Sequence, residues 1–184
     1  MNEDMCVFLS HLDVLPPKAR VELLQMVCGD RPVAQITVLK KFRSRMLPAV
    51  CQLQGMGFAL ARVEREKAIL EFYVSRNAQL SQEAAICTDI QRFGELMGFP
   101  PSAIEAYVKG QEHLLAEQQV EDLIGFPNHV FWLKFSKLCP GDAVMYLRRS
   151  YKLLLESAEH LLDDMLPEEG QPELKKKIRR FVYE

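Results

Sequence analysis

The sequence lacks the cysteine patterns that hold small secreted domains together or ligate structural zinc. Its 184 residues contain five cysteines, and no two of them form a Cys-x-x-Cys pair. An odd number of widely spaced cysteines, with no secretory signal pattern before them, is typical of proteins in a reducing compartment. We therefore expect free thiols, a cytoplasmic location and no bound metal.

Long apolar runs are also missing. The best candidate, residues 130–135, is interrupted by Lys134 and is much shorter than the roughly 20 residues that cross a bilayer. Hydrophobic residues make up 48% of the chain and charged residues 26%, a composition that excludes general disorder. The sequence thus predicts a soluble, folded protein with no membrane partner.

The signatures of common enzymes are absent as well. The chain has no glycine-rich phosphate loop, dinucleotide-binding fingerprint, serine-hydrolase elbow or His-Glu-x-x-His segment. No cofactor is therefore indicated. These absences favour a protein without enzymatic activity, and an enzyme would need a less familiar kind of site.

What the chain does contain is a segregated charge. Residues 31–67 carry eight basic and two acidic side chains, a local charge of +6, and the net charge of −2 therefore leaves −8 on the rest. Segregation of this kind suits a polyanionic partner. It equally suits attraction between parts of the chain or between two copies of it.

Apolar spacing predicts a predominantly helical α+β protein with about seven helices. Apolar residues recur every three or four positions, between proline or glycine punctuation, in seven segments: 3–12, 17–28, 33–55, 77–97, 102–124, 144–165 and 172–181. The third segment is basic and amphipathic, but its β-branched run Ile36-Thr37-Val38 also permits a strand. Helix and strand therefore both stay open over residues 31–45.

The spacing of apolar residues changes from a helical to a strand-like pattern in the middle of the chain. Two strand-like runs, 58–63 and 68–74, lie on either side of a charged tetrapeptide and predict an antiparallel β-hairpin. An isolated hairpin is marginally stable, so its apolar face must pack on helices or a third strand. The aromatic-rich residues 130–135 are the candidate for that third strand.

No low-complexity tract or long linker divides the chain. We therefore predict a single globular domain over residues 1–184, with a helical N-terminal part (1–55), the hairpin (56–75) and a helical core (76–184).

The stretch 93–105 combines a helix end, a stiff turn and a helix start. Gly98 is expected to stop the first helix, and Pro100-Pro101 prevents its continuation. Ser102 and Glu105 have the spacing of a capping box, in which the two side chains satisfy free backbone N–H groups at the helix start. The turn is predicted to position the helices around the hairpin.

A family resemblance rests on three segments: 73–84 (Tyr-Val-Ser-Arg-Asn-Ala-Gln-Leu-Ser-Gln-Glu-Ala), 93–100 (Phe-Gly-Glu-Leu-Met-Gly-Phe-Pro) and 104–107 (Ile-Glu-Ala-Tyr). Together they resemble an uncharacterised prokaryotic family, domain-of-unknown-function family 483, over about residues 56–160. That family's motif is Gly-x-Leu-Leu-Gly-Tyr-Pro, then any residue, a Cys-Cys pair and Val-Glu. Ser102 and Ala103 stand where the family has its two cysteines, whereas Glu105 matches. The turn Cys139-Pro140-Gly141-Asp142 is similar to a later cysteine-bearing turn, with one thiol. The resemblance implies a fold but lends no reaction.

Three residues are candidates for catalysis. Cys139 precedes a strong helix start, where the helix dipole can lower a thiol pKa, and His129 lies ten residues upstream. Glu105 could act as a general base, but its place in the predicted capping box explains it equally. Metal binding by these three residues has no short ligand spacing to support it. A structural role is the preferred interpretation of all three.

Other residues could bind a ligand or a polyanion. The aromatic residues Phe131, Trp132 and Phe135 could stack on a ligand, although such runs usually belong to a core. The polyanion-binding candidates are Lys40, Lys41, Arg43 and Arg45. The basic run at 175–180 follows five acidic residues, which favours a solvated or self-paired helix.

These observations favour a non-enzymatic binding or interaction module that uses helix faces near the central turn. Its partner would be another protein or a second copy of itself, as in a homodimer. One alternative is an enzyme of unknown reaction with a site near Glu105, His129 and Cys139. The other is a nucleic-acid-associated protein that uses the basic segment 31–45.

Overall fold

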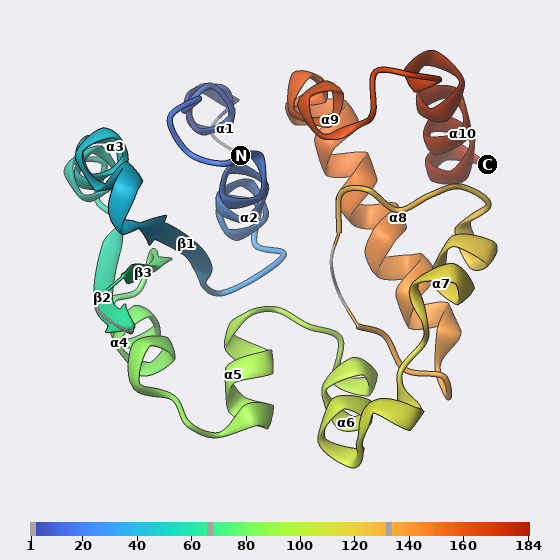
Figure 1. Ribbon diagram of the computed structural model, residues 1–184, viewed down its shortest axis with the longest axis horizontal. Helices are drawn as coiled ribbons and strands as arrows, with labels where there is room; N and C mark the ends of the chain where they lie inside the picture. Colours follow the sequence, from blue (N-terminus) through green and yellow to red (C-terminus); the bar gives the residue numbers. More distant parts are fainter. Residues whose placement is uncertain (1–2, 66–67, 132–133) are drawn as a thin grey trace. The chain divides into compact units, whose positions relative to one another are not determined.

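The computed structural model describes residues 3–65, 68–131 and 134–184. Within these ranges it contains ten α-helices and one three-stranded antiparallel sheet, which confirms the predominantly helical α+β class (Figure 1). The contacts between residues divide the chain into two compact units, Met1–Phe99 and Pro100–Glu184. Each unit is described separately below, and the single domain over 1–184 stays a prediction.

The first unit holds the whole sheet. Its elements, in chain order, are α1 (Glu3–Ser10), α2 (Pro17–Val27), β1 (Ala34–Leu39), a 3-10 turn (Lys40–Phe42), α3 (Arg43–Gly55), β2 (Ala59–Arg65), β3 (Ile69–Ser75), α4 (Ala78–Ile86) and α5 (Ile90–Leu96). The predicted hairpin is therefore present as β2 and β3. The segment 33–55, where helix and strand both stayed open at the start, forms a strand, a tight turn and a shorter helix.

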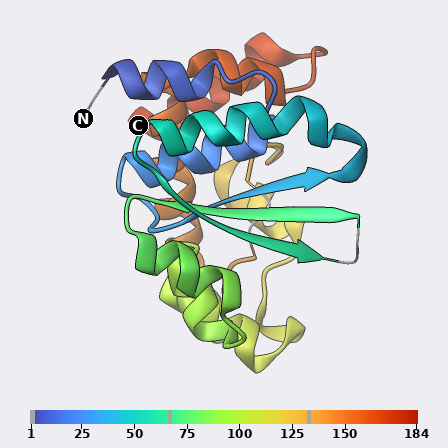
Figure 2. The same cartoon turned by 90° about the vertical axis from the view of Figure 1, so that its left-hand side faces the viewer.

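The sheet has the order β1-β3-β2, with both pairs antiparallel (Figure 2). Ile36 of β1 lies opposite Phe72, and Arg62 of β2 lies opposite the same residue from the other side. Because alternate residues of a strand share a face, Leu70, Phe72 and Val74 form the apolar face that the sequence predicts.

The third strand is not where the sequence placed it. It is β1, whose β-branched residues Ile36 and Val38 are completely buried. In the region 130–135 none of the described residues belongs to a strand, while Trp132 and Leu133 lie outside the described ranges. Ser136 makes only an isolated bridge with Leu114. The β-branched run was therefore the better strand signal, because aromatic residues fill a helical core equally well.

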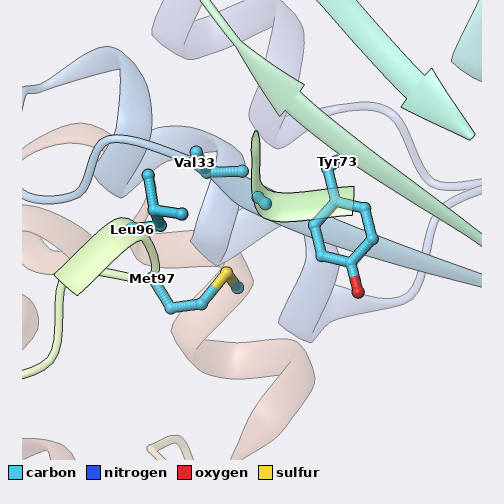
Figure 3. Close-up of a cluster of buried hydrophobic side chains, with 5 residues drawn as sticks. Val33, Tyr73, Leu96 and Met97 are labelled. Carbon is cyan, nitrogen blue, oxygen red and sulfur yellow. The ribbon is translucent and has the colours of Figure 1, made fainter. Parts of the chain in front are cut away.

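A compact apolar cluster joins the sheet to the central helices (Figure 3). Its buried members are Val33, Tyr73, Ala84, Leu96 and Met97. These residues come from the entry to β1, from β3, from α4 and from α5 with the residue after it, so the cluster holds together four segments that lie far apart in the sequence.

The central turn closes onto the entry to β1. The backbone N–H of Val33 donates to the carbonyl of Leu96 at 3.1 Å. Gly98 has a φ of +73°, and a Cβ atom added to it would lie 2.5 Å from Cβ of Arg31. Only glycine tolerates both conditions, so the Gly98 stop is also a close packing contact.

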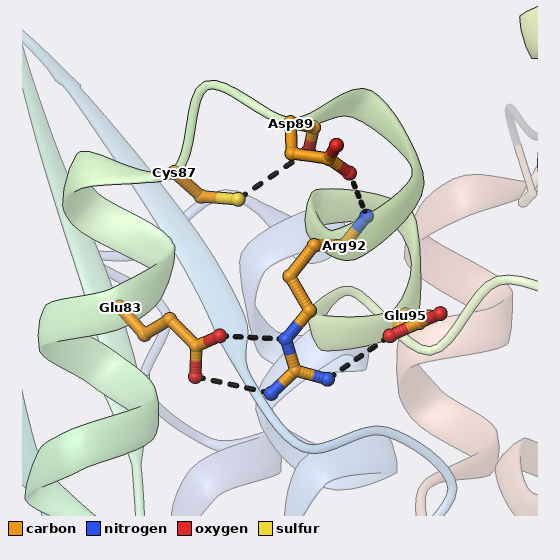
Figure 4. A network of polar contacts seen from close by, with 5 residues as sticks. All are labelled: Glu83, Cys87, Asp89, Arg92 and Glu95. Carbon is orange, nitrogen blue, oxygen red and sulfur yellow. Dashed lines mark hydrogen bonds and ion pairs between the residues drawn. The ribbon is translucent and has the colours of Figure 1, made fainter.

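The predicted helix 77–97 is divided into α4 and α5. Asn77 caps α4 by accepting from the N–H of Gln79 at 2.9 Å, and Asp89 starts a new helix by accepting from the N–H of Arg92 at 2.6 Å. The Arg92 guanidinium then joins the two helices, with Glu83 at 2.6 Å and Glu95 at 3.0 Å (Figure 4). This ion pair lowers the pKa of Glu83. Asp89 was a readable helix-start signal that the apolar periodicity concealed.

The second unit is helical throughout its described residues apart from connecting segments. It comprises α6 (Pro101–Lys109), a 3-10 turn (Gln111–His113), α7 (Glu117–Ile124), α8 (Pro140–Ser157), α9 (Glu159–Met165) and α10 (Gln171–Tyr183). The predicted helices 102–124 and 144–165 are each divided, at Gly110 with φ +131° and at Ala158. With the division after α4, these breaks account for the difference between seven predicted helices and ten observed ones.

Tyr151 of α8 lies at the centre of this unit and is completely buried. Its hydroxyl donates to the side-chain carbonyl of Asn128 at 2.9 Å, and its ring meets Phe131 edge to face at 5.0 Å. Burial raises the pKa of Tyr151. The phenol therefore remains a neutral donor, which suits a structural hydrogen bond.

None of the helices described in the two units is long and apolar enough to cross a membrane.

The Gly98 contact predicts an asymmetry between two glycine substitutions. Gly98→Ala should lower the free energy of unfolding by about 3 kcal/mol, because the left-handed backbone costs ~1–2 kcal/mol and the clash adds ~1–3 kcal/mol. Gly29→Ala is the matched control, since Gly29 has φ +82° but nothing within 4 Å of an added Cβ. It should cost only about 1 kcal/mol. Denaturant unfolding of both variants measures the difference, and equal losses would contradict the packing role of Gly98.

Candidate functional site

The predicted capping box is not formed. The residue that caps α6 is Pro100, which has no side-chain acceptor, and Pro101 occupies the first helical position. Ser102 instead donates its hydroxyl to the carboxylate of Asp142 at the start of α8. A proline-initiated helix has one fewer free N–H to satisfy, which removes part of the need for a capping side chain.

Glu105 is an exposed residue in the middle of α6. Its carboxylate accepts from the Lys109 ammonium at 2.5 Å, one helical turn later. This contact holds the pKa of Glu105 below its usual value. A general base at neutral pH needs a raised carboxyl pKa, so this environment works against that role.

The other two catalytic candidates have different surroundings. Cys139 is exposed at the residue preceding α8, and His129 is partly buried in the segment between α7 and α8. No hydrogen bond or ion pair recorded among the described residues joins Glu105, His129 and Cys139. The two hollows described below are lined by other residues. The enzyme hypothesis stays a prediction.

Over residues 3–65, 68–131 and 134–184, no three His, Cys, Asp or Glu side chains come together in a way that could hold a metal ion.

The aromatic candidates belong to the core where the structure describes them. Phe131 and Phe135 are buried, and both rings lie within 7 Å of the Tyr146 ring. Trp132 lies outside the described residues. The buried positions of the two phenylalanines fit the core interpretation.

The basic segment does not form one helix face. Lys40 and Lys41 lie in the 3-10 turn that follows β1, whereas Arg43 and Arg45 lie in the first turn of α3. Lys40, Lys41 and Arg45 are exposed, and Arg43 is partly buried. Phe42, between them, has 44% of its surface exposed, and the Lys41 ammonium lies 4.8 Å from the centre of its ring.

A hollow in the second unit was not predicted from the sequence. It has a volume of about 430 Å³ and lies between the end of α7, α8 and α10. Its lining residues are Ile124, Gly125, Phe126, Arg148, Lys177, Arg180, Phe181 and Glu184. We call this feature the α10 hollow.

The α10 hollow has an aromatic base. Phe126 is buried, and its ring packs edge to face against both Phe181 and Tyr151 at 5.5 Å. The Arg148 guanidinium lies over the Phe181 ring, 5.2 Å from its centre. That position orients the cation without neutralising it.

Three cations and one carboxylate line the α10 hollow. Arg180 is paired with Glu184 at 2.7 Å. Within the part of the chain that the structure describes, neither Arg148 nor Lys177 has a carboxylate partner. Two positive charges are therefore left beside an apolar base.

In the neighbouring hollow, of about 580 Å³, two of the three lining cations are paired with acids. Lys175 lies 2.6 Å from Glu159 and 2.8 Å from Asp163, and Arg179 lies 2.7 Å from Glu159. These contacts lower the pKa of Glu159 and raise that of Lys175. The prediction of a self-paired basic tail thus holds for Lys175, Arg179 and Arg180, whereas Lys176 and Lys177 have no carboxylate partner among the described residues.

Comparison of the chain with protein-family models, with curated proteins and with solved structures finds no match. The resemblance to domain-of-unknown-function family 483 therefore stays a prediction, and the chain's own geometry must carry the functional argument.

Thiol labelling tests the nucleophile hypothesis. In native protein at pH 8, we expect Cys139 and Cys51 to react first and at similar rates, because both are exposed. Cys6 is buried, and burial beside Cys6 raises the pKa of Cys28 to about 12, so both should react slowly. Mass spectrometry of a labelling time course measures each rate. A Cys139 rate an order of magnitude above that of Cys51 would instead support an activated nucleophile.

Proposed function

We propose that this protein is a non-enzymatic binding module that recognises an acidic segment of a partner protein in the α10 hollow. The observation that carries the proposal is the pair of cations, Arg148 and Lys177, left without carboxylate partners beside the aromatic base. A cytoplasmic setting and a homodimeric form are further parts of the proposal.

The positive charge of the α10 hollow favours a negatively charged ligand. Two unpaired cations at its rim attract carboxylates, and the attraction is strengthened by the adjoining low-dielectric aromatic surface. Arg148 is already held over the Phe181 ring, so less side-chain freedom is lost on binding.

The apolar base favours a ligand that also carries an apolar side chain. Ile124, Phe126 and Phe181 offer aromatic and aliphatic surface, and about 430 Å³ accommodates one or two side chains. An acidic peptide with one bulky apolar side chain satisfies both features. Among the described lining residues there is no Ser, Cys or His, and Glu184 is paired, so the lining suits binding rather than reaction.

A short fluorescent peptide, built of glutamates around one phenylalanine, tests the proposal. Fluorescence anisotropy should show saturable binding that weakens with added salt. Lys177→Glu and Arg148→Glu should each weaken binding by about tenfold, because each replaces an attraction by a repulsion.

Lys176→Glu is the matched control, because it makes the same charge change on the same helix at a residue that does not line the α10 hollow. Its affinity should remain within a few-fold of wild type. Equal weakening by Lys176→Glu and Lys177→Glu, or no binding by the wild-type protein, would overturn the proposal.

A nucleic-acid-associated function is the second candidate. It is favoured by the exposed residues Lys40, Lys41 and Arg45 around the exposed ring of Phe42. No ion pair with a described acidic residue neutralises these three cations. Cations beside an exposed aromatic ring are the elements of sequence-independent single-strand binding.

Retention on immobilised single-stranded DNA tests this second candidate. The double variant Lys40→Glu with Lys41→Glu should elute at lower salt, with the log–log salt slope of binding reduced by roughly 0.7 for each lost phosphate contact. Lys18→Glu with Arg76→Glu makes the same charge change elsewhere in the first unit. If both double variants elute alike, the retention reports net charge and not a site.

A further inference from the structure

The sheet of the first unit has two edge strands, β1 and β2, and they differ in their outer contacts. On β1 the backbone N–H of Gln35 donates to the Glu22 carboxylate of α2 at 3.0 Å. On β2, residues 59–65 have no recorded backbone hydrogen bond beyond their ladder with β3. Alternate N–H and C=O groups of such an edge strand point outward and can pair with another strand.

The side chains of β2 restrict which strand can add to that edge. Arg62 and Glu64 share one face of the sheet, and about half of each side chain is exposed. They make only a long contact with each other, at 3.5 Å. Both charges are therefore accessible to side chains on an added strand.

A second copy of β2 is complementary to the first. If two copies pair antiparallel around a two-fold axis at Val63, then Arg62 lies opposite Glu64 of the second copy, and Glu64 lies opposite its Arg62. Two cross-strand ion pairs form, which is the favourable arrangement for charges directly opposite each other in a sheet. On the other face, Val63 meets its own equivalent.

The neighbouring registers of β2 self-pairing place like charges opposite each other. Residues directly opposite each other must point to the same face, so the two-fold axis passes through a residue and the alternatives are centred on Arg62 or Glu64. Centring on Arg62 places two arginines opposite each other, and centring on Glu64 does the same with two glutamates. The charge pattern of β2 thus favours one register of self-pairing.

The Val63 face supports the same register. Val63 and Ala61 are partly buried and pack against the apolar cluster around Tyr73 and Ala84. A second copy placed across Val63 would continue this apolar face from one sheet into the next. The added strand would therefore gain apolar contact on one face and ion pairs on the other.

We propose that two copies of this protein associate through β2, antiparallel and centred on Val63, to form a continuous six-stranded sheet with two Arg62–Glu64 ion pairs. This inference rests on the homodimeric form included in the proposed function and names its surface. That surface belongs to the first unit and does not involve the α10 hollow, so dimerisation and peptide binding at the α10 hollow can fail separately.

Sedimentation velocity over a range of protein concentrations tests the proposal. The wild-type protein should form a reversible dimer. Arg62→Glu and Glu64→Arg should each weaken it by about tenfold or more, since each places like charges opposite each other at both contacts. Arg45→Glu, an exposed charge reversal on α3, should leave the dimer intact.

The decisive measurement mixes the two variants. Arg62→Glu protein carries only acids at these two positions and Glu64→Arg protein only bases, so a heterodimer would have opposite charges at both contacts. The mixture should regain the dimer that each variant alone has lost, which also shows that both variants are folded. A monomeric wild type, a dimer unaffected by Arg62→Glu, or a mixture that stays monomeric would each overturn the proposal.

Discussion

The buried guanidinium of Arg31 is the interaction on which the first unit depends. Only 5% of its side chain is exposed, and it contacts the Glu22 carboxylate at 3.1 Å and the Val33 carbonyl at 2.8 Å. A charge buried without such partners would cost several kcal/mol. The segment between α2 and β1 therefore has little freedom. Gly98 then packs directly on the backbone of Arg31, which ties the end of α5 to the same point.

The Glu22 carboxylate also contacts an edge strand of the sheet. One oxygen of Glu22 accepts from both Arg31 and the backbone N–H of Gln35, so the ion pair also engages the first part of β1. On β2, residues 59–65 make no recorded backbone hydrogen bond beyond their ladder with β3. This difference is the reason that the proposed self-pairing uses β2 rather than β1.

The sequence was informative where the signal was local. The hairpin of β2 and β3, its apolar face of Leu70, Phe72 and Val74, and the glycine stop at Gly98 are all present in the structure. These features depend on a few neighbouring residues, whose backbone preferences the sequence states directly.

The sequence-based predictions were wrong or incomplete where the structure depends on a contact with a residue far away in the sequence. Ser102 had the spacing of a capping residue, but Asp142, forty positions away, takes its hydroxyl. Residues 34–39 could be read as helix or strand, and pairing with β3 settles the question. Local propensity is weak where tertiary contacts can override it, so the failed capping box and the undecided segment have one cause.

Charge pairing on the two faces of α10 was also impossible to predict from the sequence alone. Lys175 and Arg179 are four residues apart, lie on one face of the helix, and meet the acids of α9. Lys177 and Phe181 are also four apart, on another face, and line the α10 hollow together with Arg148 of α8. A count of charges along the chain makes the tail appear self-paired, because the count averages over both faces. Only the neighbouring helices show that Lys175 and Arg179 are paired with acids whereas Lys177 is not, which is why the α10 hollow could not be read from the sequence.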